Sequence, residues 1–271
     1  MSCVATWRAH WREYLIEAWG LGTFMVSAVG FATLFGHPSS PLAARLPDGP
    51  LGRAPMALAM AATAVAIVYS PWGRRSGAHL NPAMTLAQFR LGKVAPADLV
   101  GYVVAQFAGA AAGVGAASAA LGGLADDPAV RHAATVPGEG GAAGAFAAEV
   151  AIAFVLLTTV LWTSAKPRWE RFTGCVAAAL VALYIAFEAP LSGMSLNPAR
   201  SFGSAAFSGV WADYWVYLCA PTLGMLAAAE IRRRTSAGGT PEGCAKLRHD
   251  VRRGCIFCAY AAGRPSHRPV S

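Results

Sequence analysis

Charged residues are scarce in this chain. They make up 13% of its 271 residues, whereas 55% of the residues are hydrophobic, and the mean hydropathy is +0.44. Soluble domains usually carry about a quarter charged residues. The composition therefore argues against an ordinary soluble protein and indicates a protein that is embedded in a membrane.

Acidic residues are especially few, with 14 Asp and Glu against 22 Lys and Arg, which gives a formal net charge of +8. A positive surplus can indicate nucleic-acid binding when the charges form a basic face with aromatic residues among them. Here they are confined to short connections and the C-terminal tail. We therefore expect no nucleic-acid partner.

Cysteines are also few, and the six present lack the spacing of a disulfide framework. Cys175 and Cys219 lie in apolar runs, where we expect them to be small buried hydrophobic residues. Cys255-x-x-Cys258, with His249 nearby, is a weak metal or redox signal, because one Cys pair falls short of a zinc pattern. The sequence thus predicts no metal site, no cofactor and, lacking a nucleophile with a matching base, no catalytic residue.

Two stretches of the chain, in contrast, match each other closely. Residues 76–85 and 192–202 both begin Ser-Gly-x-x-Leu-Asn-Pro-Ala. Asn suits the N-cap of a helix and Pro suits the first helical position, so Asn81 and Asn197 should each precede a short helix. The expected helices are Ala83–Phe89 and Ala199–Phe207.

Six apolar runs are long enough to cross a bilayer, whose core of about 30 Å needs roughly 20 helical residues. The first run is as long as a span, so no cleavable signal peptide is expected. The runs are Tyr14–Phe35, Ala54–Gly73, Leu99–Leu121, Ala142–Ala165, Phe172–Leu191 and Tyr214–Ala229. Together with the two short helices they predict an all-α membrane protein with six transmembrane helices and two re-entrant half-helices.

Three spans in each half make the second half an inverted repeat of the first. Lys and Arg favour the cytoplasmic side, and only Arg45, Arg53 and Arg131 lie opposite, with Arg200 in a half-helix. Both termini should then be cytoplasmic, in the plasma (inner) membrane, with the half-helices meeting near the midplane. The expected segments are an N-terminus (1–13), a first repeat (14–121), an extracytoplasmic loop (122–141), a second repeat (142–234) and a basic, disordered tail (235–271).

These features resemble the aquaporin (major intrinsic protein) family over residues 14–234. The resemblance rests on the two Asn-Pro-Ala boxes, Glu17-x-x-Gly20 with Glu149 at the matching place, Tyr102-Val-Val-Ala-Gln-Phe107, Trp215-Val-Tyr and Ala220-Pro221. It implies a passive channel for water and/or small neutral solutes that excludes ions and protons. It also implies a homotetramer with one pore per subunit.

The resemblance assigns roles to residues of both boxes. Asn81 and Asn197 are the implied midplane pair, and the dipoles of the two half-helices should disfavour cations there. Glu17 and Glu149 are implied to anchor loop backbone, with a proton relay as the alternative. The implied ladder of backbone carbonyls is Gly77, Ala78 and His79 in the first half and Gly193, Met194 and Ser195 in the second. His79 could instead be a pH-sensitive gate, although a structural role is favoured.

The family's outer constriction is implied to lie at Ala61, Ile185, Met194 and Arg200, counted without insertions from the two Asn residues. Arg200 could alternatively form a structural salt bridge. Strict water channels usually place Phe and His at the first two positions, so this constriction should be wider and less polar. The alternatives left open are a channel mainly for hydroxylated solutes such as glycerol or metalloid acids, a secondary transporter with inverted repeats, and a structural membrane protein.

Overall fold

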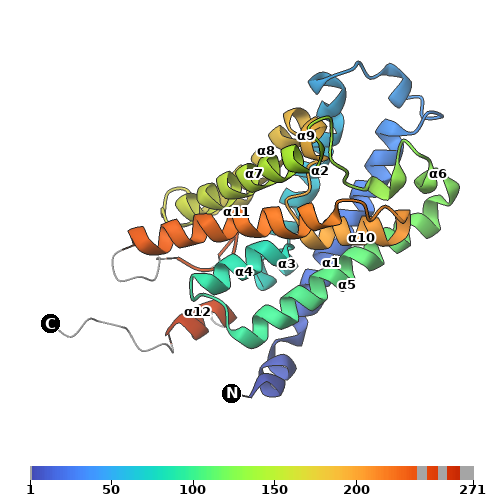
Figure 1. Cartoon of the computed structure of the whole chain (residues 1–271). Helices are drawn as coiled ribbons and strands as arrows, with labels where there is room; N and C mark the ends of the chain where they lie inside the picture. The colour runs from blue at the N-terminus through green and yellow to red at the C-terminus, as the bar shows by residue number, and fades with distance from the viewer. Residues whose placement is uncertain (1, 237–242, 250–254, 263–271) are drawn as a thin grey trace.

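A computed structural model describes residues 2–236, 243–249 and 255–262, and this part of the chain contains helices and no strand. Six of its helices are long and apolar enough to cross a membrane, as the sequence predicted (Figure 1). They are α1 (Cys3–Gly36), α2 (Pro50–Tyr69), α5 (Pro96–Leu121), α7 (Gly141–Ser164), α8 (Thr173–Phe187), which spans together with the preceding turn as Glu170–Phe187, and α11 (Tyr214–Thr235). The shorter helices are η1 (Ala43–Arg45), α3 (Pro71–Ser76), α6 (Gly123–Asp126), η2 (Arg131–Ala133), η3 (Glu170–Phe172), α9 (Ala189–Ser192) and α12 (Ile256–Ala262).

The two Asn-Pro-Ala boxes begin α4 (Pro82–Arg90) and α10 (Pro198–Ser208). Each Asn caps its helix, because its side chain accepts a hydrogen bond from a backbone N–H of the first turn. At about 1.5 Å per residue neither helix can cross a bilayer. Figure 1 shows α4 and α10 lying end to end between the longer helices.

Span two differs from its expected course. We expected one helix over Ala54–Gly73, but α2 ends at Tyr69 and α3 begins at Pro71. Pro71 has no N–H to continue α2, and the Ser70 side chain caps the new helix by accepting a bond from Gly73 N at 2.9 Å. The expected span is therefore two helices that meet at Ser70.

Small residues bring the spanning helices into close contact. On α5, a Cβ atom added to Gly109 would lie 2.2 Å from the carbonyl oxygen of Ala18 on α1. One added to Gly113 would lie 2.2 Å from the carbonyl of Gly22. The Gly109-x-x-x-Gly113 pair therefore lets two backbones touch, as small residues do where helices pack in lipid.

We expect Gly109→Ala to destabilise the protein and Gly30→Ala not to. Nothing lies within 4 Å of a Cβ atom added to Gly30 on α1. Both changes gain helix propensity of up to about 1 kcal/mol, but only the first forces helices apart, at roughly 1–3 kcal/mol. Thermal aggregation of the detergent-solubilised variants measures the difference. Equal midpoints would show that the close crossing contributes nothing.

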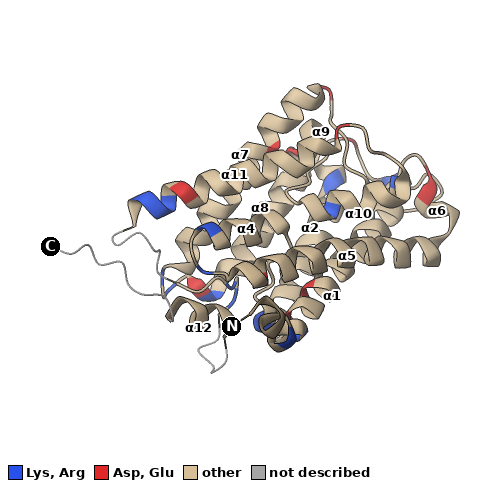
Figure 2. Cartoon of the chain, turned by 60° about the horizontal axis from the view of Figure 1, so that its bottom comes forward, with Lys and Arg blue, Asp and Glu red and all other residues tan. Residues whose placement is uncertain are grey.

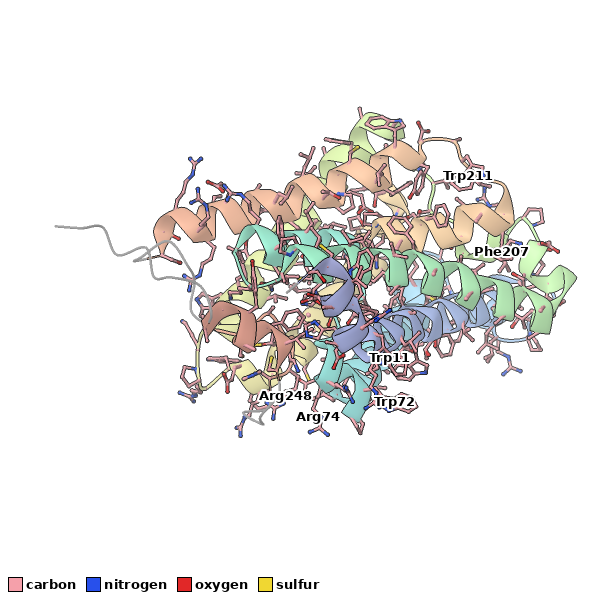
Figure 3. The ribbon with its side chains drawn as sticks, turned by 90° about the horizontal axis from the view of Figure 1, so that it is seen from below. Trp11, Trp72, Arg74, Phe207, Trp211 and Arg248 are labelled. Atoms are coloured by element: carbon pink, nitrogen blue, oxygen red, sulfur yellow. The ribbon has the colours of Figure 1, made fainter. Side chains whose placement is uncertain are left out.

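Charged and aromatic residues mark the ends of the bundle. Figure 2 shows Lys, Arg, Asp and Glu mainly at the two ends and few along the middle of the long helices. Trp11 and Trp72 lie at one end, and Phe207 and Trp211 lie at the other (Figure 3). All four are about half exposed, as expected of aromatic belts at the two membrane interfaces.

Two predictions from the sequence, on the burial of two cysteines and on the disorder of the tail, are wrong. Cys175 and Cys219 are exposed rather than buried, because the outer faces of spanning helices are apolar and need no protein cover. Part of the tail, expected to be disordered from residue 235, is folded onto the bundle. Residues 243–249 and 255–262, here called the tail segment, bury Ala245 and Phe257 to 2% exposure. Residues 237–242, 250–254 and 263–271 lie outside the described residues.

Candidate functional site

A cavity of about 330 Å³ lies between the two halves of the bundle and is lined by residues from both boxes. Most of its lining is apolar and comes from α1, α2, α7 and α8. The polar residues along it are Arg53, His79, Asn81, Ser195, Asn197 and Arg200. A long apolar cavity with a few polar groups is the usual form of a small-molecule path.

The loops before the two boxes have the same unusual backbone. Three residues of each loop have positive φ: Gly77 (101°), Ala78 (52°) and Leu80 (52°), and Gly193 (77°), Met194 (51°) and Leu196 (58°). A left-handed conformation costs a non-glycine residue roughly 1–2 kcal/mol. Such strain persists only where surrounding contacts hold it, which is common at functional sites.

Glu17 holds the first loop. Its buried carboxylate accepts hydrogen bonds from Ser76 Oγ at 2.8 Å and from the backbone N–H groups of His79 at 3.1 Å and Leu80 at 2.7 Å. Gln106 Nε2 donates a further bond at 2.8 Å. These four hydrogen bonds satisfy both oxygens of the carboxylate and compensate for its burial.

Glu149 holds the second loop in the same way. Its carboxylate, also fully buried, accepts bonds from Ser192 Oγ at 2.8 Å, Ser195 N at 2.6 Å and Leu196 N at 2.7 Å. The three donors stand at the positions that correspond to Ser76, His79 and Leu80. Both carboxylates are fully engaged by loop donors, which is the geometry of an anchor.

The two Asn side chains tie the half-helices together across the centre. Asn81 Nδ2 donates to the carbonyl of Leu196 at 2.7 Å, and Asn197 Nδ2 donates to the carbonyl of Leu80 at 2.7 Å. Their Oδ1 atoms cap α4 and α10. Each amide therefore spends one of its two N–H groups on the opposite loop, and both residues line the cavity.

Comparison with known proteins agrees with this arrangement. A family model described as "Major intrinsic protein" matches residues 4–231. The chain belongs to the major intrinsic protein family. It is therefore an integral membrane protein, and its half-helices are those of the family fold.

Individual members of the family match most of the bundle. The "Glycerol uptake facilitator protein-like 6" of Lactiplantibacillus plantarum is 33% identical over 80% of this chain and 95% of its own length. Aquaporin-4 of Mus musculus is 30% identical over 83% of this chain and 67% of its own. The solved aquaglyceroporin of Plasmodium falciparum has the same fold, with a TM-score of 0.65 at 22% identity, covering 82% of this chain and 95% of that one.

Three of the four residues expected at the family's outer constriction line the cavity, namely Ile185, Met194 and Arg200. Ala61 does not, and this is a correction. The face of α2 toward the cavity consists of Arg53, Met56, Met60, Ala64 and Val68. Ala61 thus lies on α2 but outside the set of residues that line the cavity.

The expected ladder of backbone carbonyls is also changed at one position. Ala78 and His79 line the cavity in the first half, and Gly193, Met194 and Ser195 do so in the second. Gly77 does not line it, because its carbonyl accepts a hydrogen bond from Leu247 N of the tail segment at 3.1 Å. His79 Nε2 donates to the carbonyl of Ala245 at 3.0 Å, and its Nδ1 contacts Thr85 Oγ1 at 3.1 Å.

The role of two tyrosines, one for each loop, was not predicted from the sequence. Tyr102 donates to the carbonyl of Ser76 at 2.6 Å, and Tyr217 donates to the carbonyl of Ser192 at 2.6 Å. They follow their serines by 26 and 25 residues. This nearly equal spacing in the two repeats is the signal that could have identified them.

Proposed function

We propose that the chain conducts small uncharged hydroxylated solutes such as glycerol, together with water. The family membership makes it a passive channel for water and/or small neutral solutes. The observation that carries the narrower proposal is the lining of the cavity, which is apolar apart from a few donors. The relative named as a glycerol uptake facilitator supports the same substrate class.

We place the constriction by the register of α2 against α8. Arg53 Nε donates to the carbonyl of Ala186 at 2.8 Å, and Val68 lies beside Gly174. The two helices are therefore antiparallel neighbours, and Ile185 lies at the level of the α2 turn that contains Met56. We propose that Met56 takes the place that the sequence count gave to Ala61.

A constriction of Met56, Ile185, Met194 and Arg200 suits a polyol. Three apolar side chains can contact the carbon face of the solute, while the guanidinium donates hydrogen bonds to its hydroxyl groups. Water alone would lose hydrogen bonds on the apolar side without gaining contacts. The lining therefore favours solutes that have both an apolar carbon face and hydroxyl groups.

The centre of the cavity supports exclusion of ions and protons. Asn81 and Asn197 each keep one amide N–H for a passing oxygen, since the other is bonded to the opposite loop. The N-termini of α4 and α10 add positive potential at the same place, which disfavours cations. We propose that Glu17 and Glu149 are loop anchors, because their oxygens are already occupied.

We further propose cytoplasmic termini in the plasma (inner) membrane and a homotetramer with one pore per subunit. The distribution of Lys and Arg supports this orientation. The proposed segments remain residues 1–13, 14–121, 122–141, 142–234 and the tail from 235. Catalysis has no role in this proposal.

Stopped-flow light scattering on proteoliposomes tests the proposed function. We expect glycerol, boric acid and water each to cross faster than through lipid alone, with urea slower than glycerol because it lacks hydroxyl groups. Fast water flux with glycerol at the lipid rate would show a strict water channel and contradict the proposed substrate class.

Met56→Phe tests the proposed constriction, with Ala61→Phe as its control. We expect Met56→Phe to lower the glycerol permeability by about tenfold or more, since a rigid ring replaces a flexible thioether and about 1.4 kcal/mol of added barrier gives that factor. Ala61→Phe should leave the glycerol-to-water permeability ratio unchanged. If Ala61→Phe lowered the glycerol permeability in the same flux assay and Met56→Phe did not, Ala61 rather than Met56 would lie at the constriction.

A further inference from the structure

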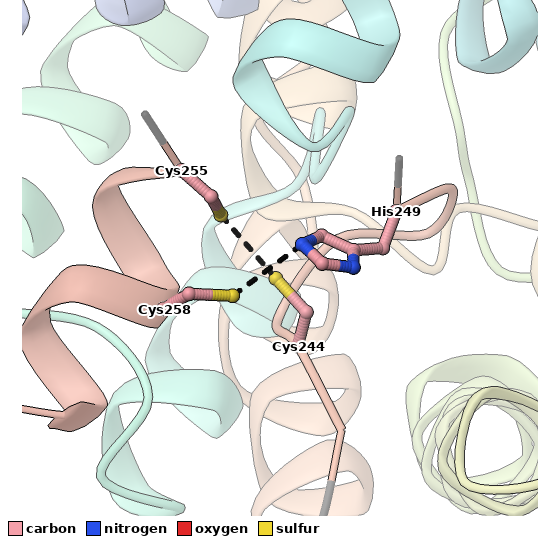
Figure 4. A group of neighbouring side chains, drawn as sticks. All are labelled: Cys244, His249, Cys255 and Cys258. Carbon is pink, nitrogen blue, oxygen red and sulfur yellow. Dashed lines mark hydrogen bonds between the residues drawn. The ribbon is translucent and has the colours of Figure 1, made fainter. Parts of the chain in front are cut away.

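Four potential metal-binding side chains converge within the tail segment. The ligand atoms of Cys244, His249, Cys255 and Cys258 all lie within 4.8 Å of one another. Cys244 Sγ is 3.5 Å from Cys255 Sγ, and Cys258 Sγ is 3.4 Å from His249 Nε2. Figure 4 shows the four side chains pointing toward a common centre. Cys258 lies in α12 and Cys255 just before it, whereas Cys244 and His249 come from the non-helical residues 243–249.

We propose that these four residues bind one Zn²⁺ ion, which clamps the tail segment over one mouth of the channel. A tetrahedral zinc ion has bonds of about 2.3 Å to sulfur and 2.0–2.1 Å to nitrogen, so its ligand atoms lie roughly 3.3–3.8 Å apart. The Cys244–Cys255 distance of 3.5 Å and the Cys258–His249 distance of 3.4 Å fall in this range. Three Cys and one His are also a common ligand set of structural zinc sites.

The ligand spacing explains why the sequence signal was weak. Cys255-x-x-Cys258 is an ordinary zinc pair, but its partner pair is Cys244-x4-His249, with one Cys and one His. Folding brings the two pairs together. The family match ends at residue 231, so the cluster belongs to a part of the chain beyond it.

The tail segment has little regular structure of its own. Its only helix is the seven-residue α12, and short segments of this kind usually need a metal or disulfide to fold. Three thiolates and a zinc ion carry a net charge of −1, once the thiol protons have left for solvent. Lys246 and Arg248 lie within the segment. These cations suit a negative cluster.

The tail segment lies directly against the first loop. Lys246 Nζ donates to the carbonyls of Arg74 at 3.0 Å and Arg75 at 2.7 Å. Phe257 stacks on the His79 ring at a centroid distance of 5.2 Å. These contacts add to the backbone bond from Leu247 to Gly77, so a clamped tail segment is fixed to the loop that precedes Asn81.

Leu247 connects the metal cluster to the solute path. It lies between the ligands Cys244 and His249 and is among the residues that line the cavity. An apolar side chain held there narrows the path at the tail end. Releasing the metal should free the segment from which Leu247 projects, and permeability should then rise. This part of the inference rests on the proposed channel function.

Metal analysis of the full-length protein tests the site without reference to transport. Protein purified without a polyhistidine tag should contain about one zinc per chain, and Cys255→Ser should lose it. Cys219→Ser, which changes an exposed cysteine elsewhere, should keep it. Cobalt substitution should give the intense visible bands of a tetrahedral thiolate site. Absence of metal, or a Cys244–Cys255 disulfide found by mass spectrometry of the freshly isolated protein, would overturn the proposal.

Flux measurements then test the clamp. We expect wild-type water and glycerol permeability to rise several-fold when zinc is chelated, and Cys255→Ser to have the high value with or without zinc. Leu247→Ala should retain zinc and also have the high value. If zinc is bound but the permeability is the same with and without the chelator and in both variants, the proposed clamp is wrong and the metal site still stands. Permeability equal to lipid in every state would instead contradict the channel function, leaving the metal result to stand.

Discussion

Glu149→Gln is expected to remove most of the folded, conducting protein. The carboxylate accepts three bonds from Ser192, Ser195 and Leu196 in a fully buried setting. An amide of the same shape replaces one acceptor oxygen by a donor, which then faces loop N–H groups. Breaking a buried, hydrogen-bonded charge typically costs about 3–5 kcal/mol. We expect the midpoint of thermal aggregation to fall by roughly 10 °C, with loss of glycerol flux per reconstituted chain.

Glu139→Gln is the matched control, because Glu139 is exposed in the loop between the halves. It should change neither stability nor flux. The proton-relay alternative makes a different prediction for Glu149→Gln. A relay would leave the stability and the neutral-solute flux intact and abolish only a proton-dependent component. That pattern would contradict the anchor role.

Arg200→Val is expected to weaken selection at the outer mouth. Arg200 is half-buried, lines the cavity, and its Nη1 has no hydrogen-bond partner among the described residues. Removing the guanidinium enlarges the constriction and removes the positive charge that repels cations. We expect the permeability to solutes larger than glycerol to rise by about tenfold, which corresponds to roughly 1.4 kcal/mol of barrier. A measurable cation leak should accompany it.

Arg45→Val is the control for this change, since Arg45 is exposed and lies on the same side of the proposed topology. Its selectivity should equal that of the wild type. Solute ratios and ion conductance measured on the same vesicles separate the two effects. Unchanged selectivity in Arg200→Val would favour a purely structural role for the arginine.

The repeated parts of the fold could be predicted from the sequence because local rules determine them. Asn-Pro begins a helix, about 20 apolar residues cross a bilayer, and two matching boxes in inverted halves must face each other. The pairing of Glu17 and Glu149 with the loops, in contrast, was implied by the family resemblance. None of these conclusions depended on side-chain detail.

Predictions were less accurate where they depended on counting residues between distant positions, or where a segment has no counterpart in the other half of the chain. Ala61 was assigned by distance along the chain, whereas Met56 and Met60 are α2 residues that line the cavity. The tail was expected to be disordered because Cys255-x-x-Cys258 has no second Cys pair in the sequence, and only the fold brings Cys244 and His249 beside it. Long-range contacts, which the sequence does not display, decided both outcomes.

The concentration dependence of glycerol flux tests the central account most directly. It should be measured in proteoliposomes with and without a zinc chelator, and with and without ion gradients. A path lined by the two Asn-Pro-Ala half-helices predicts flux above that of lipid that rises linearly with the glycerol gradient and ignores ion gradients. Flux that saturates, or that requires an ion gradient, would contradict the channel and indicate a transporter.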